Sequence, residues 1–182
     1  MSEIANQLPQ AVNGGGVDER LDLDEHQYLT FQLAGEVYGI GILSIKEILE
    51  YGELTHVPMM PDSIRGVINL RGSVVPVIDL STRIGKGKED LSKKTCIVIL
   101  EVQHDEDVLD IGIVVDAVNE VLEISPSEIE PPPSFGAKIR TDFITGMGKI
   151  QNKFVVLLNI KQVLSVDELS FITQGIEDGA SV

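Results

Sequence analysis

Residues 64–80 read IRGVINLRGSVVPVIDL, a pattern that is typical of a β-hairpin. Two apolar runs, 67–70 and 74–78, flank the tripeptide Arg71-Gly72-Ser73. Glycine readily adopts the positive φ angle that a tight hairpin turn requires, so Gly72 marks the turn. The segment therefore predicts two antiparallel strands that are connected at an arginine.

The pattern recurs in the second half of the chain. Residues 144–160, ITGMGKIQNKFVVLLNI, align with 64–80 without a gap. Matched blocks that occur twice in the same order indicate a duplicated β unit. The upstream matches are residues 39–40 with 112–113 and residues 45–50 (IKEILE) with 118–123 (VNEVLE).

The two copies differ at the turn. Arg71 and Gly72 of the first copy correspond to Gln151 and Asn152 of the second. A repeat that served only the architecture would keep the strands and leave the turn free to vary, so we look for function at the arginine hairpin. The alternative is that Arg71 is a solvated turn residue with no further role.

Composition limits the classes of partner. The chain has 182 residues, 43% of them apolar, and a formal charge of −15, which repels a phosphate backbone or an anionic membrane surface. Protein partners are more plausible. The polar N-terminus, the lack of a long apolar run and the single Cys96, which we expect to be a buried hydrophobe, predict a cytoplasmic chain.

The spacing of strands and turns predicts an all-β fold. Strand-like runs recur about every ten residues with turn signals between them, which favours two small five-stranded barrels that bury a shared seam. Asp79 and Asn159 are placed to cap short helices. The expected organisation is a disordered acidic leader (1–26), a domain of two interleaved lobes (27–172; mainly 27–85 and 95–160), a C-terminal helix (about 160–172) and a frayed tail (173–182).

Residues that would support catalysis or metal binding are not found at the necessary spacings. His26, His56 and His104 lie far apart, and the motifs of common hydrolases, nucleotide sites and metalloproteases do not occur. The lone Gly146-Met147-Gly148 lacks the third glycine of a dinucleotide site. We expect no cofactor and no metal, and an adaptor accounts for this better than an enzyme does.

An ordered set of motifs resembles the CheW family of chemotaxis coupling proteins. The set is YGIGILSIKEIL, IRGVINLRGSVVPVIDL, IGIVVDAVNEVLEI, FITGMGKI and VVLLNI, and it extends from about residue 28 to about residue 169. The resemblance implies two SH3-like five-stranded β-barrels packed side by side. It also implies a non-enzymatic adaptor that links the cytoplasmic tips of methyl-accepting chemoreceptors to the regulatory domain of the histidine kinase CheA, in arrays at the membrane. That regulatory domain is itself similar to CheW, so the two can pair pseudo-symmetrically.

The resemblance also implies site residues. The arginine and glycine of the family's turn fall on Arg71 and Gly72, and the acidic partner of that arginine falls on Glu47, which would form a surface ion pair beside the groove between the barrels. Such a pair adds little to stability, so a role in orienting a partner is more reasonable. Further receptor or kinase contacts would be Ile45, Arg65, Gly66, Val67 and Asn69, with weaker second-lobe candidates Val118, Glu120 and Gly146.

Alternatives remain for individual residues and for the function. Ile45 and Val67 are also compatible with ordinary barrel core, and Arg65 with a solvated position. The adaptor could serve a paralogous chemosensory pathway, such as one that controls pilus motility. A small barrel that binds a ligand or an oligonucleotide would need a basic, aromatic face, and only 4% of the residues are aromatic.

Overall fold

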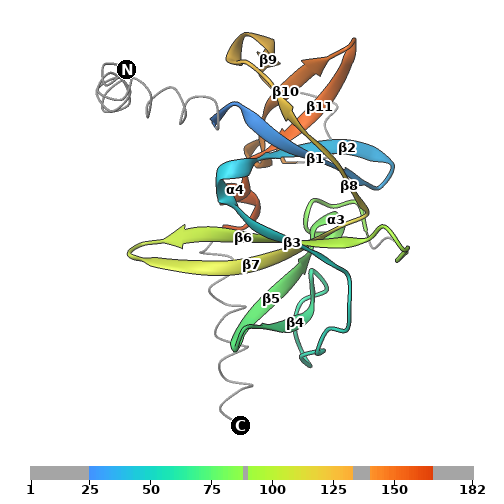
Figure 1. Cartoon of the computed structure of the whole chain (residues 1–182), viewed down its shortest axis with the longest axis vertical. Coiled ribbons are helices and arrows are strands. Elements are labelled where there is room, and N and C mark those ends of the chain that lie inside the picture. Colours follow the sequence, from blue (N-terminus) through green and yellow to red (C-terminus); the bar gives the residue numbers. More distant parts are fainter. Residues whose placement is uncertain (1–24, 88–89, 133–139, 166–182) are drawn as a thin grey trace, which may run out of the picture.

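The computed structural model of the protein describes residues 25–87, 90–132 and 140–165. Within these ranges the chain forms two sheets with two short α-helices between them (Figure 1). The strands of the first repeat are β1 (Gln27–Leu33), β2 (Glu36–Gly41), β3 (Ile45–Glu50), β4 (Ile64–Leu70) and β5 (Ser73–Asp79). Those of the second are β6 (Cys96–His104), β7 (Asp107–Val115), β8 (Ala117–Glu123), β9 (Ile129–Glu130), β10 (Ile144–Ile150) and β11 (Lys153–Leu158).

The short helical elements follow strands at equivalent places. The α-helices are α3 (Leu80–Arg83) and α4 (Ile160–Val163), and the 3₁₀ turns are η2 (Ile42–Ser44), η3 (Pro126–Glu128) and η4 (Thr141–Phe143). Oδ1 of Asp79 accepts a hydrogen bond from the Thr82 amide, and Oδ1 of Asn159 accepts one from the Gln162 amide, both at 3.4 Å. The predicted helix caps are confirmed.

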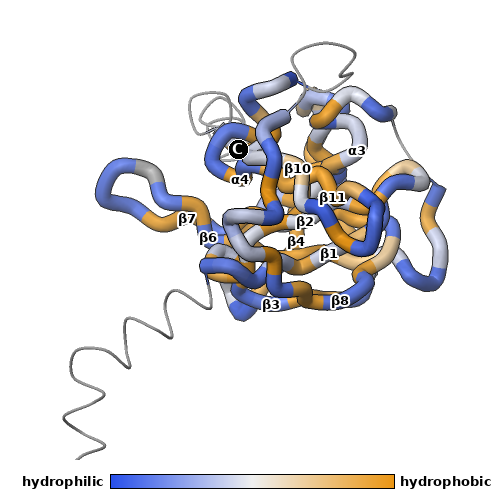
Figure 2. The backbone as a smooth tube through the Cα atoms, turned by 90° about the horizontal axis from the view of Figure 1, so that it is seen from above, coloured by the Kyte–Doolittle hydropathy of each residue, from blue (hydrophilic) through white to orange (hydrophobic). Residues whose placement is uncertain are grey.

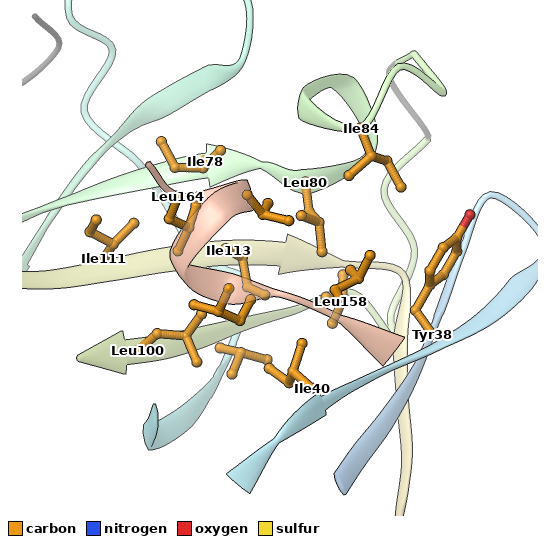
Figure 3. Packing of buried hydrophobic residues seen from close by; sticks show 14 of the residues in the cluster. Tyr38, Ile40, Ile78, Leu80, Ile84, Leu100, Ile111, Ile113, Leu158 and Leu164 are labelled. Carbon is orange, nitrogen blue, oxygen red and sulfur yellow. The ribbon is translucent and has the colours of Figure 1, made fainter. Parts of the chain in front are cut away.

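Each sheet surrounds a small apolar core, and a larger core lies between the sheets. The five-stranded barrel (order β3-β6-β7-β5-β4) packs side chains such as Val77 and Ile99 inside, and the six-stranded barrel (order β8-β1-β2-β11-β10-β9) packs Ile124 and Leu157. The larger core draws buried residues from both barrels and both helices, which confirms the predicted shared seam. Figure 3 shows Tyr38, Ile40, Ile78, Leu80, Ile84, Leu100, Ile111, Ile113, Leu158 and Leu164 in this core.

The barrels exchange hairpins. The β1–β2 hairpin of the first repeat belongs to the six-stranded barrel, where β2 pairs in parallel with β11, and the β6–β7 hairpin of the second belongs to the five-stranded barrel, where β7 pairs in parallel with β5. Each barrel still takes most of its strands from one repeat, three of five and four of six, and the exchanged hairpins show how the two expected lobes interleave. A repeated pattern identifies the strands of each copy, but it does not say which copy a hairpin pairs with.

The six-stranded barrel has one strand more than expected, and the segment of the other barrel that corresponds to this extra strand is shorter. The extra strand, β9, has two residues and pairs with Met147 and Gly148 of β10. In the first repeat the equivalent contact is a single bridge, in which Thr55 and Val67 exchange two backbone hydrogen bonds of 2.9 Å. The two barrels therefore differ in the length of this contact and not in strand arrangement.

Several predictions concern residues outside the described ranges. The C-terminal helix begins at Ile160 as expected, and α4 ends at Val163. The remainder of that predicted helix beyond Ser165, nearly all of the predicted leader and the predicted frayed tail lie outside the described residues.

Arg65 forms an internal ion pair. Its Nε lies 3.1 Å from Oδ2 of Asp79, whose side chain is 2% exposed, and its guanidinium lies 6.0 Å from the centroid of the Tyr51 ring. The alternative that Arg65 is solvated is wrong. In the second repeat the two positions are Thr145 and Asn159, so neutral residues replace the ion pair there.

Removing Arg65 alone should be costly, and copying the second repeat should repair the loss. Arg65→Thr leaves the buried carboxylate of Asp79 without its cation, so we expect the free energy of unfolding to fall by about 3 kcal/mol. In the double variant Arg65→Thr/Asp79→Asn neither charge remains, and most of the loss should return. Urea denaturation measures both values, and a double variant as unstable as the single one would contradict the explanation.

Candidate functional site

The β4–β5 turn has a geometry that favours glycine or asparagine over arginine. Arg71 and Gly72 have φ angles of 52° and 88°, as a type I′ turn requires, and Oδ1 of Asn69 accepts a hydrogen bond of 2.8 Å from the Gly72 amide. The predicted hairpin is confirmed. A side chain with a Cβ is strained at positive φ, so an arginine here is retained at a cost in backbone free energy. The equivalent turn, Gln151-Asn152, has φ angles of 49° and 65°, which means that the shape is kept while the charge is not.

Arg71 binds Glu47 of β3 in a bidentate ion pair. Nη2 lies 2.7 Å from Oε2, and Nη1 lies 3.2 Å from Oε1. The hydrogen bond from Arg71 is the main reason that the pKa of the Glu47 carboxyl lies below its ordinary value. The Arg71 side chain is 69% exposed, so the pair presents a fixed cation to solvent at the place where the tip of the β4–β5 hairpin meets β3. The ion pair implied by the resemblance is present.

A row of charges continues from this pair toward the β6–β7 hairpin. Nζ of Lys46 lies 2.8 Å from Oδ2 of Asp110 and 3.8 Å from Oε1 of Glu101. Figure 2 shows the β6–β7 hairpin extending away from the barrels with hydrophilic residues at its tip. Charges of both signs therefore alternate along one rim of the molecule, from Arg71 to Glu101.

Next to Glu101 lies a groove between the barrels, whose lining mixes apolar with polar and charged side chains. It consists of two adjoining pockets of about 270 and 300 Å³, which share Leu43 and Ser44 of η2 and Ile160 and Lys161 of α4. Tyr28 and Leu158 line the first pocket, and Val102, Val108 and Glu101 line the second. We call this surface the inter-barrel groove. Because η2 belongs to the first repeat and α4 to the second, neither repeat forms the groove alone.

Two first-repeat candidates serve the barrel itself. Gly66 is buried with a φ of +154°, and a Cβ there would lie 2.5 Å from the carbonyl oxygen of Thr55. The close backbone approach expected at this glycine is therefore made by the chain itself. Ile45 is partly buried and packs against the shared core, in agreement with the core alternative. Val67 is half-buried beside Gly66 at the bridge to Thr55.

The second-repeat candidates are mostly structural as well. Gly146 is buried, and a Cβ there would lie 2.5 Å from Cγ2 of Ile129, while Val118 packs against the shared core. Glu120 is exposed, and both its amide and its carbonyl are hydrogen bonded to the buried hydroxyl of Thr30, at 3.2 and 2.7 Å. Among these three residues, only Glu120 is exposed.

The sequence reasoning missed four exposed apolar residues. Ile48 and Val74 lie on the five-stranded barrel, and Val121 and Phe154 occupy the equivalent repeat positions on the six-stranded barrel. Phe154 has the largest side chain of the four and is 49% exposed. The repeat alignment contained a signal for them, because both copies keep an apolar residue at these two strand positions. Ile48 and Val121 lie on the edge strands β3 and β8, and Val74 and Phe154 lie on the inner strands β5 and β11. We call these two pairs of residues, one pair on each barrel, the barrel-edge patches.

The described ranges hold no group of three or more His, Cys, Asp or Glu side chains that could bind a metal ion. In the same ranges no helix is long and apolar enough to cross a membrane. Cys96 is partly exposed, and burial is the main cause that raises the pKa of its thiol. It is less buried than the sequence suggested.

Comparison with known proteins gives a consistent result. The family model for the CheW-like domain matches residues 27–168. The chemotaxis protein CheW of Klebsiella aerogenes is 34% identical over 146 residues, which cover 80% of this chain and 86% of that protein. CheW of Bacillus subtilis is 33% identical over 137 residues, which cover 75% of this chain and 85% of that protein.

A solved structure agrees with the fold as well. The crystal structure of the scaffolding protein TtCheW from Thermoanaerobacter tengcongensis has a TM-score of 0.70 and 36% identity, covering 79% of this chain and 90% of that one. The match spans both barrels and the groove between them, and the family's motifs lie on the strands that build these features. The chain therefore belongs to the CheW-like family, the scaffolding adaptors of bacterial chemotaxis.

Proposed function

We propose that this protein couples the cytoplasmic tips of methyl-accepting chemoreceptors to the regulatory domain of the histidine kinase CheA by binding both at once, without a chemical step. The observation that carries the proposal is the Arg71–Glu47 pair, held in a strained turn and followed by Lys46, which pairs with Glu101 at the inter-barrel groove. The ion pair adds little stability, so it does not offset the backbone strain at Arg71. A role in binding a partner explains why an arginine occupies this turn. The same surfaces would serve an adaptor of a paralogous chemosensory pathway.

The inter-barrel groove and its charged rim suit a receptor tip. A groove with both apolar and polar lining accepts an amphipathic helix, and charges near the groove set the register. Leu43 and Val108, which are 58% and 54% exposed, would contact the helix, while Lys46, Glu47 and Arg71 would pair with its polar side chains. Because the rim alternates in charge, it discriminates among helices by their charge order more than by net charge.

The barrel-edge patches suit the kinase. A regulatory domain with the same pair of barrels would present the same kind of edges, so the two proteins can associate edge to edge. Ile48 and Val74 would form the contact on one barrel, and Val121 and Phe154 the contact on the other. Exposed apolar residues at the centre of a patch supply most of the binding free energy of such interfaces. An adaptor with an edge on each barrel can bridge neighbours in a receptor array.

Reversing the charge of Arg71 should weaken receptor binding and spare the fold. Arg71→Glu places a second carboxylate beside Glu47, so we expect affinity for a receptor signalling fragment to fall at least about tenfold, with a change in Tm below about 3 °C. Gln151→Glu is the matched control, because it makes the same residue at the equivalent turn. Titration calorimetry and thermal unfolding measure the two effects, and a large fall in Tm would show that Arg71 is structural.

Charging the barrel-edge patches should separate the two partners. Val74→Glu or Phe154→Glu should weaken binding of the CheA regulatory domain at least about tenfold and leave receptor-fragment binding unchanged. Leu91→Glu, which also places a charge at an exposed apolar residue, is the control. Kinase binding that survives both patch variants would exclude the barrel edges as the contact.

The pKa of the Glu47 carboxyl should depend on the ion pair with Arg71. Its pKa is lowered from 4.5 chiefly by the hydrogen bond from Arg71, so the pair is intact above that value and is lost as the pH falls through the lowered pKa. In Arg71→Ala the pKa of Glu47 should rise toward 4.5. Carboxyl NMR titration checks this shift, and an unchanged pKa would show that the pair does not persist in solution.

A further inference from the structure

The last residues of the two short α-helices meet where the barrels join. Arg83 ends α3 and Val163 ends α4, and the repeat makes these positions equivalent. Nε of Arg83 donates a hydrogen bond of 2.7 Å to the carbonyl oxygen of Val163. Carbonyl groups in the last turn of a helix have no partner within the helix, so this arginine satisfies one of them from the other repeat.

Arg83 is also connected to the first end of α4, through Phe143. The guanidinium carbon of Arg83 lies 5.0 Å from the centroid of the Phe143 ring, and that of Arg140 lies 4.3 Å from it. The carbonyl of Phe143 accepts a hydrogen bond of 2.7 Å from the amide of Asn159, the residue that caps α4. Phe143 itself is 2% exposed. One side chain of the first repeat thus contacts both the end of α4 and the residue that anchors its start.

The position of α4 matters because α4 is one wall of the inter-barrel groove. Ile160 and Lys161 line both pockets, and Asn159 lines one of them. A helix of four residues has too few internal hydrogen bonds to set its own orientation, so contacts from outside determine where it lies. Arg83 lines neither pocket, yet it supplies such a contact.

We infer that Arg83 is a positioning residue for the inter-barrel groove: it holds α4 so that Ile160 packs beneath the groove and Lys161 faces the receptor helix. The inference rests on the receptor binding proposed above. It adds Arg83, which lies on α3 of the first repeat and acts on α4, the groove wall that the second repeat supplies. The hydrogen bond from α3 to α4 has no equivalent from α4 to α3. The residue of α4 equivalent to Arg83 is Val163, whose apolar side chain cannot return the hydrogen bond to α3.

The test measures how variants of the full-length protein bind each of the two partners. Arg83→Ala should weaken binding of a receptor signalling fragment by about tenfold, because without the hydrogen bond to Val163 only a small fraction of molecules hold α4 in the binding position. Binding of the CheA regulatory domain should stay within about twofold. Arg83→Lys keeps a cation and a donor and should recover most of the receptor affinity. Lys94→Ala, which removes one exposed positive charge elsewhere, is the control.

Methyl NMR gives a direct readout of the groove wall. The δ1 methyl signal of Ile160 should shift in Arg83→Ala and return toward its wild-type position in Arg83→Lys, an effect that a general loss of stability would not produce. If Arg83→Ala does not fold, Phe143→Leu removes the ring that Arg83 contacts, keeps the backbone hydrogen bond from Asn159 and should show the same selective loss.

The outcomes separate this inference from the proposed function. Normal receptor binding by Arg83→Ala with an unmoved Ile160 signal overturns the positioning role alone. An equal loss for both partners, with a lower Tm, shows a structural role and overturns it as well. A wild-type chain that does not bind the receptor fragment overturns the proposed function, and with it any part that Arg83 has in binding.

Discussion

Two parallel strand contacts hold the molecule together. Leu157 of β11 lies opposite Gly39 of β2, and Val77 of β5 lies opposite Gly112 of β7, so the same contact occurs once in each barrel. Both rely on glycine, because a Cβ on Gly39 would lie 3.0 Å from a Leu157 methyl and one on Gly112 would lie 2.9 Å from an Ile97 methyl. Through these contacts each repeat lends its first hairpin to the other barrel. The two barrels therefore cannot separate without breaking both sheets, and the shared core follows from that constraint.

The inter-barrel groove follows from the same exchange. Since the chain leaves β2 in one barrel and enters β3 in the other, the intervening η2 crosses between them and places Leu43 at the groove. On the opposite wall, α4 follows β11 directly. A surface built from both repeats over a common core suits a protein whose proposed task is to hold two others in a fixed relation.

The scaffold is symmetric, but its chemistry is not. At three equivalent places the first repeat has an arginine where the second has a neutral residue: Arg71 against Gln151, Arg65 against Thr145 and Arg83 against Val163. The first arginine faces solvent, the second is paired with the buried Asp79, and the third reaches into the other repeat. Three arginines at repeat-equivalent positions thus have three different roles. In an acidic chain these few cations stand out, and each has a specific acceptor or ring beside it.

The sequence by itself determined the local structure: the hairpin at Arg71-Gly72, the caps at Asp79 and Asn159 and the repeat that relates them. These features depend on φ preferences, apolar alternation and side-chain hydrogen bonds that span only a few residues. Motif order was enough to identify the family and to place Glu47 opposite Arg71. Only the tertiary structure decided that the hairpins change barrels, that Arg65 turns inward, that Gly66 meets Thr55 and that Arg83 reaches α4. Each of these depends on a contact between residues distant in the chain, and neither propensity nor periodicity encodes which distant segment comes to lie alongside.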